Sequence, residues 1–404
     1  MNKGEATSTE NGNHFHRYLN YAISLLENYK GKEPFHLYLK KYFSVNKKHG
    51  SKDRKLISSL CYDYFRLGFG VRPELGLTEK LILGTFLIEN NPSKFLEKFQ
   101  PEWNETIHED LYAKIKLVGD IFNTGNIFPL KEELSSDINI QKFNLSLLIQ
   151  PKFFVRIRPG KESIVLSTLK SSNISFEKLN ERCLAFSNNE KISNHLSIDK
   201  DVVIQDYSSQ HAEDLLKEQL PVEGSKICLW DCCAASGGKS ILAKDILKNI
   251  ELTVSDTRQS ILRNLKFRFE NAGILNYTSF IADLSVSTPL KEINKSFDTI
   301  IADVPCSGSG TWGRTPEQLS FFDKKEIKRY AELQQKIVTN ALRYLKENGL
   351  LLYITCSVFK KENEENVTFI QQHSNLQLIK SEYLKGYEIQ ADTLFVALFK
   401  KILK

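Results

Sequence analysis

The pattern of apolar and polar positions changes twice along the chain. Between residues 15 and 142, apolar residues recur at intervals of three and four positions, as at 18–26 and 56–65, which is the spacing of one helix face. Turn-forming residues interrupt this pattern at 90–92 and 122–126. This part of the chain therefore predicts a helical domain.

A mixed pattern begins at residue 153. Apolar and polar residues alternate over 153–158, helix-like spacing follows at 162–169, and the apolar run at 183–186 is typical of another strand. These elements predict a small α+β unit that follows the helical domain.

From about residue 222, short apolar runs alternate with helical stretches. Near-continuous apolar strands separated by helices indicate a parallel sheet that is covered on both faces. The runs lie at 226–230, 252–254, 299–302 and 350–354. A last run at 394–399 adds one more strand with no helix after it.

Composition and pattern together place the chain in a broad class. From the pattern we expect three domains, at 1–145, 146–204 and 205–404. The composition, with 41% hydrophobic and 26% charged residues, excludes a wholly disordered or fibrous chain. No apolar run approaches the ~18 residues that span a bilayer, and from the polar first residues we expect no export signal. Seven cysteines without a CxxC pair fit neither a disulfide framework nor a zinc knuckle. We therefore expect a cytoplasmic protein without a metal site.

Basic residues are distributed unevenly. Residues 1–72 hold 13 Lys+Arg against 6 Asp+Glu, residues 73–150 hold 7 against 12, and residues 151–200 hold 9 against 5, while the remainder is neutral. A surface that faces a polyanion is therefore expected in the first or the third of these segments. Charge alone leaves a solvated lysine-rich surface as the alternative.

Small residues follow the first strand of the α/β domain. The sequence Asp-Cys-Cys-Ala-Ala-Ser-Gly-Gly-Lys occupies 231–239, before a helical stretch at 241–247, and lets the backbone approach a ligand at the carboxyl edge of the sheet. Asp256 ends the next strand, 25 residues after Asp231, where a ribose-binding carboxylate belongs. Because the loop is neither GxGxxG nor a Walker loop, an adenosine ligand smaller than a dinucleotide fits best. A purely structural turn is the alternative.

Two cysteines lie at other strand ends of the same sheet. Cys306 lies in Asp-Val-Pro-Cys-Ser-Gly-Ser-Gly at 303–310, and Cys356 lies in Thr-Cys-Ser at 355–357. A lone cysteine is usually a buried packing residue, but two of them beside an adenosine pocket indicate nucleophilic chemistry. A thiolate that adds to carbon 6 of a pyrimidine makes carbon 5 able to attack an electrophilic methyl group, and a second group must then remove the proton of carbon 5.

These motifs resemble those of a known enzyme family. The segments 233–239, 303–310 and 355–357 are similar to the S-adenosylmethionine-dependent RNA cytosine-5 methyltransferases of the Fmu/Sun (RsmB-type) family, and 205–210 resembles the segment that enters its catalytic domain. Lys-Asp-Arg-Lys at 52–55 and the helix after it resemble the NusB-like amino-terminal domain of bacterial members. The resemblance implies a Rossmann-like methyltransferase sheet, parallel with an antiparallel last strand, preceded by an all-α NusB-like domain and a small α+β RNA-binding unit.

The resemblance also implies roles for individual residues. Cys356 matches the family's nucleophile, and Cys306 matches the cysteine that assists product release. Asp256 corresponds to the acid on the cofactor's ribose hydroxyls, Asp283 to the acid near its adenine, and Asp303 to an acid between cofactor and target base. The remainder of the implied S-adenosylmethionine site is the loop Cys233, Ala234, Ala235, Ser236, Gly237, Gly238 and Lys239.

Several positions depart from the family pattern. Ser236 stands where proline is usual, so the loop loses a fixed φ. Lys360 and Lys361 replace a usual Pro-Glu pair, and Thr393 replaces a common glycine. None of these changes removes a group that the chemistry requires.

The leading hypothesis is a monomeric enzyme that methylates carbon 5 of a cytosine in bacterial small-subunit ribosomal RNA, with RNA as its partner and no membrane. A transfer RNA substrate is the near alternative. A non-catalytic RNA-binding assembly factor belongs to a different class, but it has no reason to keep Cys306, Cys356 and Lys239 together. A small-molecule methyltransferase would leave the basic segments without a use.

Overall fold

The computed structural model describes residues 6–188, 190–220, 226–247 and 249–403. The chain divides into two compact units that interleave in sequence. The first comprises the residues up to Glu132 together with Asn139–Gln150 and Trp312–Asp323. The second comprises Glu133–Ile138, Pro151–Thr311 and the residues from Lys324 onward.

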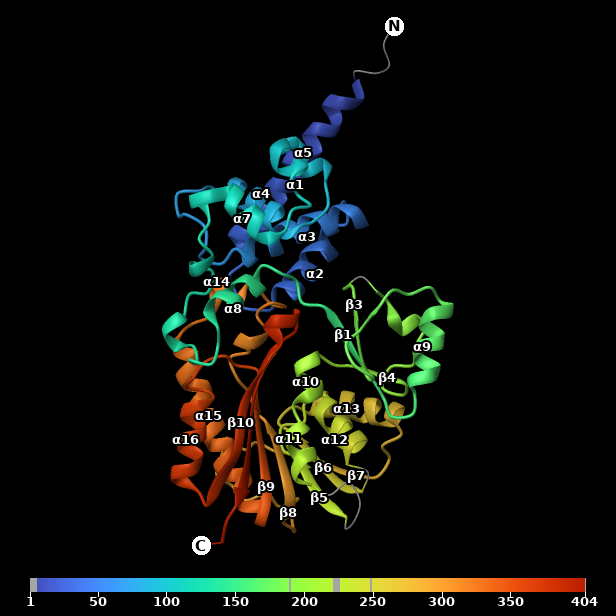
Figure 1. The fold of residues 1–404 in the computed structure, drawn as a ribbon, viewed down its shortest axis with the longest axis vertical. Coiled ribbons are helices and arrows are strands. Elements are labelled where there is room, and N and C mark those ends of the chain that lie inside the picture. The colour runs from blue at the N-terminus through green and yellow to red at the C-terminus, as the bar shows by residue number, and fades with distance from the viewer. Residues whose placement is uncertain (1–5, 189, 221–225, 248, 404) are drawn as a thin grey trace. The chain divides into compact units, whose positions relative to one another are not determined.

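The first unit is helical, as the apolar spacing predicted (Figure 1). Polar side chains begin several of its helices, because the first backbone N–H groups of a helix need acceptors. Asp53 accepts a hydrogen bond from Gly50 N at 2.9 Å, and Asp110 accepts one from Ala113 N at 3.0 Å. The helices are α1 (Ala6–Asn28), α2 (Phe35–Val45), α3 (Ser51–Arg66), α4 (Leu77–Ile88), α5 (Lys94–Phe99), α6 (Pro101–Glu105), α7 (Leu111–Val118), α8 (Ile140–Leu147) and α14 (Gln318–Phe321).

A segment from the middle of the α/β sequence lies in this helical unit. Trp312 is buried, and its ring centroid lies 5.5 Å from that of Phe128. Glu317 is also buried and accepts a hydrogen bond from Phe35 N, at the start of α2, at 3.1 Å. Helix α2 therefore obtains its N-terminal acceptor from a residue 282 positions away.

The second unit contains a small four-stranded antiparallel sheet in the order β2-β3-β1-β4. Helix α9 (Glu162–Ser171) buries Val165 and Leu169 against it. The strands are β1 (Phe153–Ile157), β2 (Glu177–Lys178), β3 (Cys183–Phe186) and β4 (Val202–Ile204). Both expected strands and the expected helix are present, with β2 and β4 in addition. The division of the chain into three domains stays a prediction.

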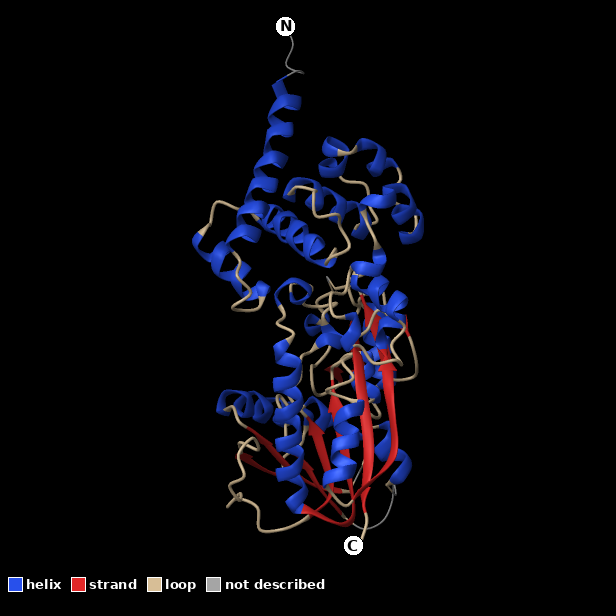
Figure 2. Cartoon of the chain, turned by 90° about the vertical axis from the view of Figure 1, so that its left-hand side faces the viewer, coloured by secondary structure: helices blue, strands red, loops and turns tan. Residues whose placement is uncertain are grey.

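The larger sheet of this unit has seven strands in the order β10-β11-β9-β8-β5-β6-β7. Figure 2 shows the strands of the chain in red and the helices in blue. Strands β9, β8, β5, β6 and β7 are parallel, whereas the last strand, β11, runs antiparallel between β9 and β10. This confirms the predicted fold class. The strands are β5 (Ile227–Asp231), β6 (Ile250–Asp256), β7 (Tyr277–Ile281), β8 (Phe297–Asp303), β9 (Leu345–Thr355), β10 (Leu376–Lys385) and β11 (Thr393–Lys401).

Helices lie on either side of these strands (Figure 1). Helices α12 and α13 bury apolar residues such as Ile241 and Phe269 in a cluster with Leu229 of β5 and Val254 of β6. The helices are α10 (Tyr207–His211), α11 (Asp214–Gln219), α12 (Gly238–Ile246), α13 (Gln259–Ala272), α15 (Lys325–Ala341) and α16 (Glu364–His373). Short 3₁₀ turns are η1 (Gly119–Ile121), η2 (Thr124–Asn126), η3 (Lys131–Glu133), η4 (Ile192–Asn194), η5 (Ser309–Thr311), η6 (Leu342–Tyr344) and η7 (Gly386–Ile389).

The sequence pattern did not predict the two edge strands. Strands β7 and β10 carry mostly exposed or half-buried residues, whereas the central strand β8 is largely buried. An edge strand faces solvent, so it lacks the continuous apolar run by which central strands are recognised. Among the helices that the structure describes, none combines the length and apolar character needed to cross a membrane.

Candidate functional site

A cleft of about 530 Å³ opens at the carboxyl ends of β5, β6, β8 and β9. The order of the sheet reverses between β5 and β8, which is where open α/β sheets bind ligands. Seven of the residues predicted from the sequence line the cleft: Cys233, Ala235, Asp256, Asp283, Asp303, Cys306 and Cys356. The other predicted residues, Ala234, Ser236, Gly237, Gly238 and Lys239, belong to the loop and helix start behind Cys233 and Ala235.

The loop after β5 has the backbone conformation that its small residues suggested. Ala235 has φ 44° and Gly237 has φ 83°, both in the left-handed region. A Cβ atom at Gly237 would lie 2.6 Å from a ring carbon of Phe269, so only glycine fits the close packing of the loop on α13. The glycine therefore serves the turn and the helix contact.

Asp256 ends β6 and is held in the cleft by several donors. Its Oδ2 accepts from Ala235 N at 3.1 Å, and Arg258 donates its backbone N–H and its guanidinium N–H groups to both oxygens. Burial alone would raise the pKa of Asp256, but the hydrogen bonds from Arg258 and Ala235 outweigh it and hold the pKa below the ordinary value. The carboxylate is therefore ionised at neutral pH.

Asp283 lies just after β7, at the open side of the same cleft. Its Oδ1 accepts from Ser285 N at 2.8 Å and from Ser285 Oγ at 2.6 Å. Its side chain is exposed, and Oδ2 faces no donor among the described residues. Asp256 and Asp283 thus both contribute carboxylates to the lining of the cleft.

The two cysteines predicted to carry the chemistry, Cys306 and Cys356, are in contact through their sulfur atoms. The Sγ atoms of Cys306 and Cys356 lie 3.0 Å apart, and Cys356 N donates to Cys306 Sγ at 3.3 Å. Both cysteines are free. The hydrogen bond with Cys356, followed by burial, raises the pKa of Cys306 well above the ordinary value. Cys306 is therefore a protonated thiol next to the sulfur of Cys356.

A half-buried ion pair lies beside the thiols. Lys239 Nζ contacts Asp303 Oδ2 at 2.9 Å. Burial lowers the pKa of Lys239, but the charge of Asp303 and its hydrogen bond outweigh burial and raise the pKa overall, and Cys356 acts in the same direction. Lys239 is therefore a fixed positive charge within electrostatic range of Cys356.

Glu362 is a site residue that the sequence reasoning did not single out. Its Oε2 accepts from Ser307 N at 2.9 Å and from Gln334 Nε2 at 2.9 Å, and its Oε1 accepts from Ser357 Oγ at 2.7 Å. Ser307 follows Cys306 and Ser357 follows Cys356, so one buried carboxylate joins the two thiol-bearing loops. An acid six positions after a strand-end cysteine was the available signal, but its burial was not visible.

Glu213, at the start of α11, is a second acid that was missed. It is 1% exposed, and neither carboxyl oxygen has a hydrogen-bond partner among the described residues. Burial raises its pKa well above the ordinary value, while the nearby charge of Lys239 acts in the opposite direction. Nothing in the local sequence distinguishes Glu213 from an exposed helix residue.

Solved structures with the same fold extend over most of the chain. The crystal structure of PH0851 superposes with a TM-score of 0.68 at 19% identity, over 96% of this chain and 98% of that one. A methyltransferase homolog protein from Pyrococcus horikoshii superposes with a TM-score of 0.55 at 20% identity, over 67% of this chain and 92% of that one. At these identities the likeness concerns the fold.

Sequence relatives match the second half of the chain. The ribosomal RNA small subunit methyltransferase B of Photorhabdus laumondii is 32% identical over 183 residues, which is 45% of this chain and 41% of that protein. The probable ribosomal RNA small subunit methyltransferase B of Bacillus subtilis is 29% identical over 236 residues, 57% of this chain and 52% of that protein. The chain thus matches about half the length of these relatives or less.

The family model described as 16S rRNA methyltransferase RsmB/F matches residues 219–399, the stretch that contains the sheet, the cleft and both thiols. The resemblance found in the sequence motifs is confirmed over this stretch. This part of the chain is therefore similar to the RsmB/F methyltransferase domain.

Proposed function

We propose that the protein transfers a methyl group from S-adenosylmethionine to carbon 5 of a cytosine in RNA, and that the RNA is bacterial small-subunit ribosomal RNA. The observation that carries the proposal is the pair of free thiols, with Sγ atoms 3.0 Å apart, in a cleft that is also lined by three carboxylates. Relatives named as ribosomal RNA small subunit methyltransferases support the substrate.

The cleft has the groups that an adenosine-bearing cofactor requires. Asp256 and Asp283 supply acceptors for hydroxyl and amino groups, and Ala282, Leu284 and Ile337 supply apolar surface for a base. Arg258 uses the lone pairs of Asp256, but its side chain is 60% exposed, so ribose hydroxyls can take its place. When bound, S-adenosylmethionine supplies an electrophilic methyl group to carbon 5.

The two thiols have separate tasks in this chemistry. The Cys356 thiolate forms a bond to carbon 6 of the cytosine, which shifts the ring electron pair to carbon 5. The resting Cys306 thiol must first release its own proton to solvent. After carbon 5 is methylated, the resulting Cys306 thiolate accepts the carbon 5 proton, the C–H electron pair restores the ring double bond, and Cys356 leaves carbon 6 as a thiolate with the electron pair of the broken bond. Lys239, paired with Asp303, places a positive charge close to Cys356.

A substrate test separates this proposal from its alternatives. The full chain is incubated with S-adenosylmethionine and either small-subunit ribosomal RNA or transfer RNA, and bisulfite sequencing maps protected cytosines. We expect protection in the ribosomal RNA. Protection only in transfer RNA would change the substrate, and RNA binding without any protected cytosine would favour the non-catalytic assembly factor.

Cofactor binding is expected to depend on the charge of Asp256. In the full chain, Asp256→Asn should weaken S-adenosylmethionine binding by about tenfold to a hundredfold, because hydrogen bonds to a charged acceptor contribute about 1.5–3 kcal/mol. Isothermal titration calorimetry measures the change. Arg258→Ala is the matched control, because it keeps the carboxylate and removes only its exposed partner. Equal affinity in the Asp256 variant, or binding of NAD or ATP in place of S-adenosylmethionine, would contradict the cofactor assignment.

RNA affinity is expected to depend on exposed lysines near the start of α3. We expect a fourfold Lys→Gln variant to weaken RNA binding and to reduce the slope of log K against log salt by about 0.7 to 0.9 for each phosphate that is no longer neutralised. The substituted residues are Lys47, Lys48, Lys52 and Lys55. The control substitutes four exposed lysines from the acidic segment of the same unit, Lys94, Lys98, Lys116 and Lys131. Equal slopes for the two variants would mean that the first group is only a solvated surface.

A further inference from the structure

Ser236, the residue that departs from the family's proline, is held from outside its loop. Arg268 of α13 donates from Nη1 to Ser236 Oγ at 3.0 Å and to Ser236 O at 3.1 Å. One guanidinium nitrogen therefore binds both the side chain and the backbone of the residue between Ala235 and Gly237. The hydroxyl adds a contact that a proline ring has no atom to make.

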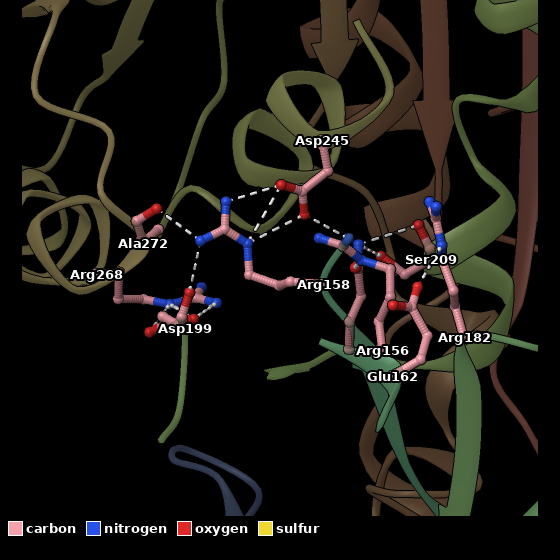
Figure 3. A network of polar contacts seen from close by, with 10 residues as sticks. Arg156, Arg158, Glu162, Arg182, Asp199, Ser209, Asp245, Arg268 and Ala272 are labelled. Atoms are coloured by element: carbon pink, nitrogen blue, oxygen red, sulfur yellow. Dashed lines mark hydrogen bonds and ion pairs between the residues drawn. The ribbon is translucent and has the colours of Figure 1, made fainter. Parts of the chain in front are cut away.

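The other side of the same guanidinium is fixed by the small α+β unit. Arg268 donates from Nη2 to Asp199 Oδ1 at 2.7 Å and from Nε to Asp199 Oδ2 at 3.0 Å (Figure 3). The Asp199 side chain is 5% exposed and that of Arg268 is 20% exposed, so solvent screens this pair little. A two-pronged contact of this kind fixes the direction of the guanidinium as well as its position.

Asp199 is itself tightly placed. Its carbonyl oxygen accepts from Arg158 Nη1 at 3.1 Å, and Arg158 also binds the carboxylate of Asp245 on α12 and the carbonyl of Ala272 at the end of α13 (Figure 3). Asp199 N donates to Val202 O at 2.7 Å. The acid that orients Arg268 is therefore part of a network that joins the small sheet to α12 and α13.

We propose that Asp199, Arg268 and Ser236 form a positioning relay that holds the cofactor loop in its binding conformation. This inference rests on the proposed S-adenosylmethionine site. In place of the fixed φ of a proline, the loop has a hydrogen bond whose donor, Arg268, is oriented by the small α+β unit. Ser236 and Asp199 are positioning residues, because they act on the cofactor through the loop backbone and through Arg268. The small unit, whose basic residues are expected to contact RNA, thereby has a direct connection to the cofactor loop.

The test measures S-adenosylmethionine binding to the full chain by calorimetry. Ser236→Ala and Asp199→Asn should each weaken binding by about threefold to tenfold, the range for one hydrogen bond. The double variant should lose no more affinity than the single variant with the larger loss, because both changes interrupt one relay. Asparagine suits position 199, where φ is 66°, because it tolerates the left-handed region.

Two further variants make the result specific. Ser236→Thr keeps the hydroxyl and should restore near wild-type affinity. Glu162→Gln, which breaks the partly exposed Arg182–Glu162 pair of the small unit, should leave affinity unchanged. Wild-type affinity in Ser236→Ala and Asp199→Asn, even with a lowered melting temperature, or multiplied losses in the double variant, would overturn the relay. Failure of the wild-type chain to bind S-adenosylmethionine would instead refute the proposed function.

Discussion

A Cys306→Ala variant is expected to stay covalently attached to its RNA, whereas a Cys356→Ala variant is expected to form no adduct. Cys356 makes the bond to carbon 6, so its removal should abolish methylation and leave RNA and cofactor binding intact. Cys306 acts after methyl transfer, so its removal should leave the methylated adduct unable to lose the carbon 5 proton. A denaturing gel with labelled RNA should show a slowly migrating species for Cys306→Ala.

Because the two sulfur atoms are in contact, control variants are needed to separate the roles of Cys306 and Cys356. The double variant should show no adduct, because the bond to carbon 6 is never formed. Cys228→Ala, in β5 but absent from the cleft lining, should behave like the wild type. A trapped species with Cys356→Ala alone would mean that the two roles are exchanged. Methylation that persists in both single variants would mean that the thiols only pack.

Loss of the Glu362 carboxylate is expected to damage activity and stability together. Glu362→Ala removes the acceptor of three hydrogen bonds, two of them buried. We therefore expect methylation to fall by at least about a hundredfold, the effect expected when the thiols are displaced by about an ångström. The free energy of unfolding should fall by a few kcal/mol, because each unpaired buried donor costs about 1–3 kcal/mol. Single-turnover methylation and chemical denaturation measure the two effects.

The geometry predicts that glutamine rescues this position. An amide oxygen at the Oε2 position still accepts from Ser307 N and Gln334 Nε2, while the amide N–H₂ meets the Ser357 hydroxyl, which can accept as well as donate. Glu362→Gln should therefore keep most of the activity. Exposed Glu365→Ala is the control and should be neutral. If glutamine were as damaging as alanine, charge would be the requirement; if alanine lost only stability, Glu362 would have no part in placing the thiols.

The fold class and the chemistry-bearing segments could be predicted from the sequence because both leave local patterns. The central strands are buried on both faces, so they appear as continuous apolar runs. The carboxyl ends of parallel strands share one edge of the sheet, so residues that follow different strands meet there. This reasoning brought Cys306 and Cys356 to one cleft with Asp256, as the structure has them. Their catalytic and cofactor-binding roles stay predictions.

Other features depend on contacts between distant residues. Cys306 and Cys356 are 50 positions apart, Asp199 and Arg268 are 69 apart, and Phe35 and Glu317 are 282 apart. The spacing of apolar and polar residues does not indicate which residues far apart in the sequence come into contact. The side chains of β7 and β10 are mostly exposed or half-buried because these strands form the edges, and that position follows only from the pairing of all seven strands.

The burial of acids is the clearest case of what tertiary structure alone decided. Glu362 is 0% exposed and fully hydrogen-bonded, Glu213 is 1% exposed without a partner among the described residues, and Glu365 is exposed, although all three occur in polar stretches near or within helices. In the sequence, all three positions are the same residue type with the same carboxyl group. Its pKa and its task come from the desolvation and the donors that the assembled fold places around it, because both are properties of neighbours brought from elsewhere in the sequence.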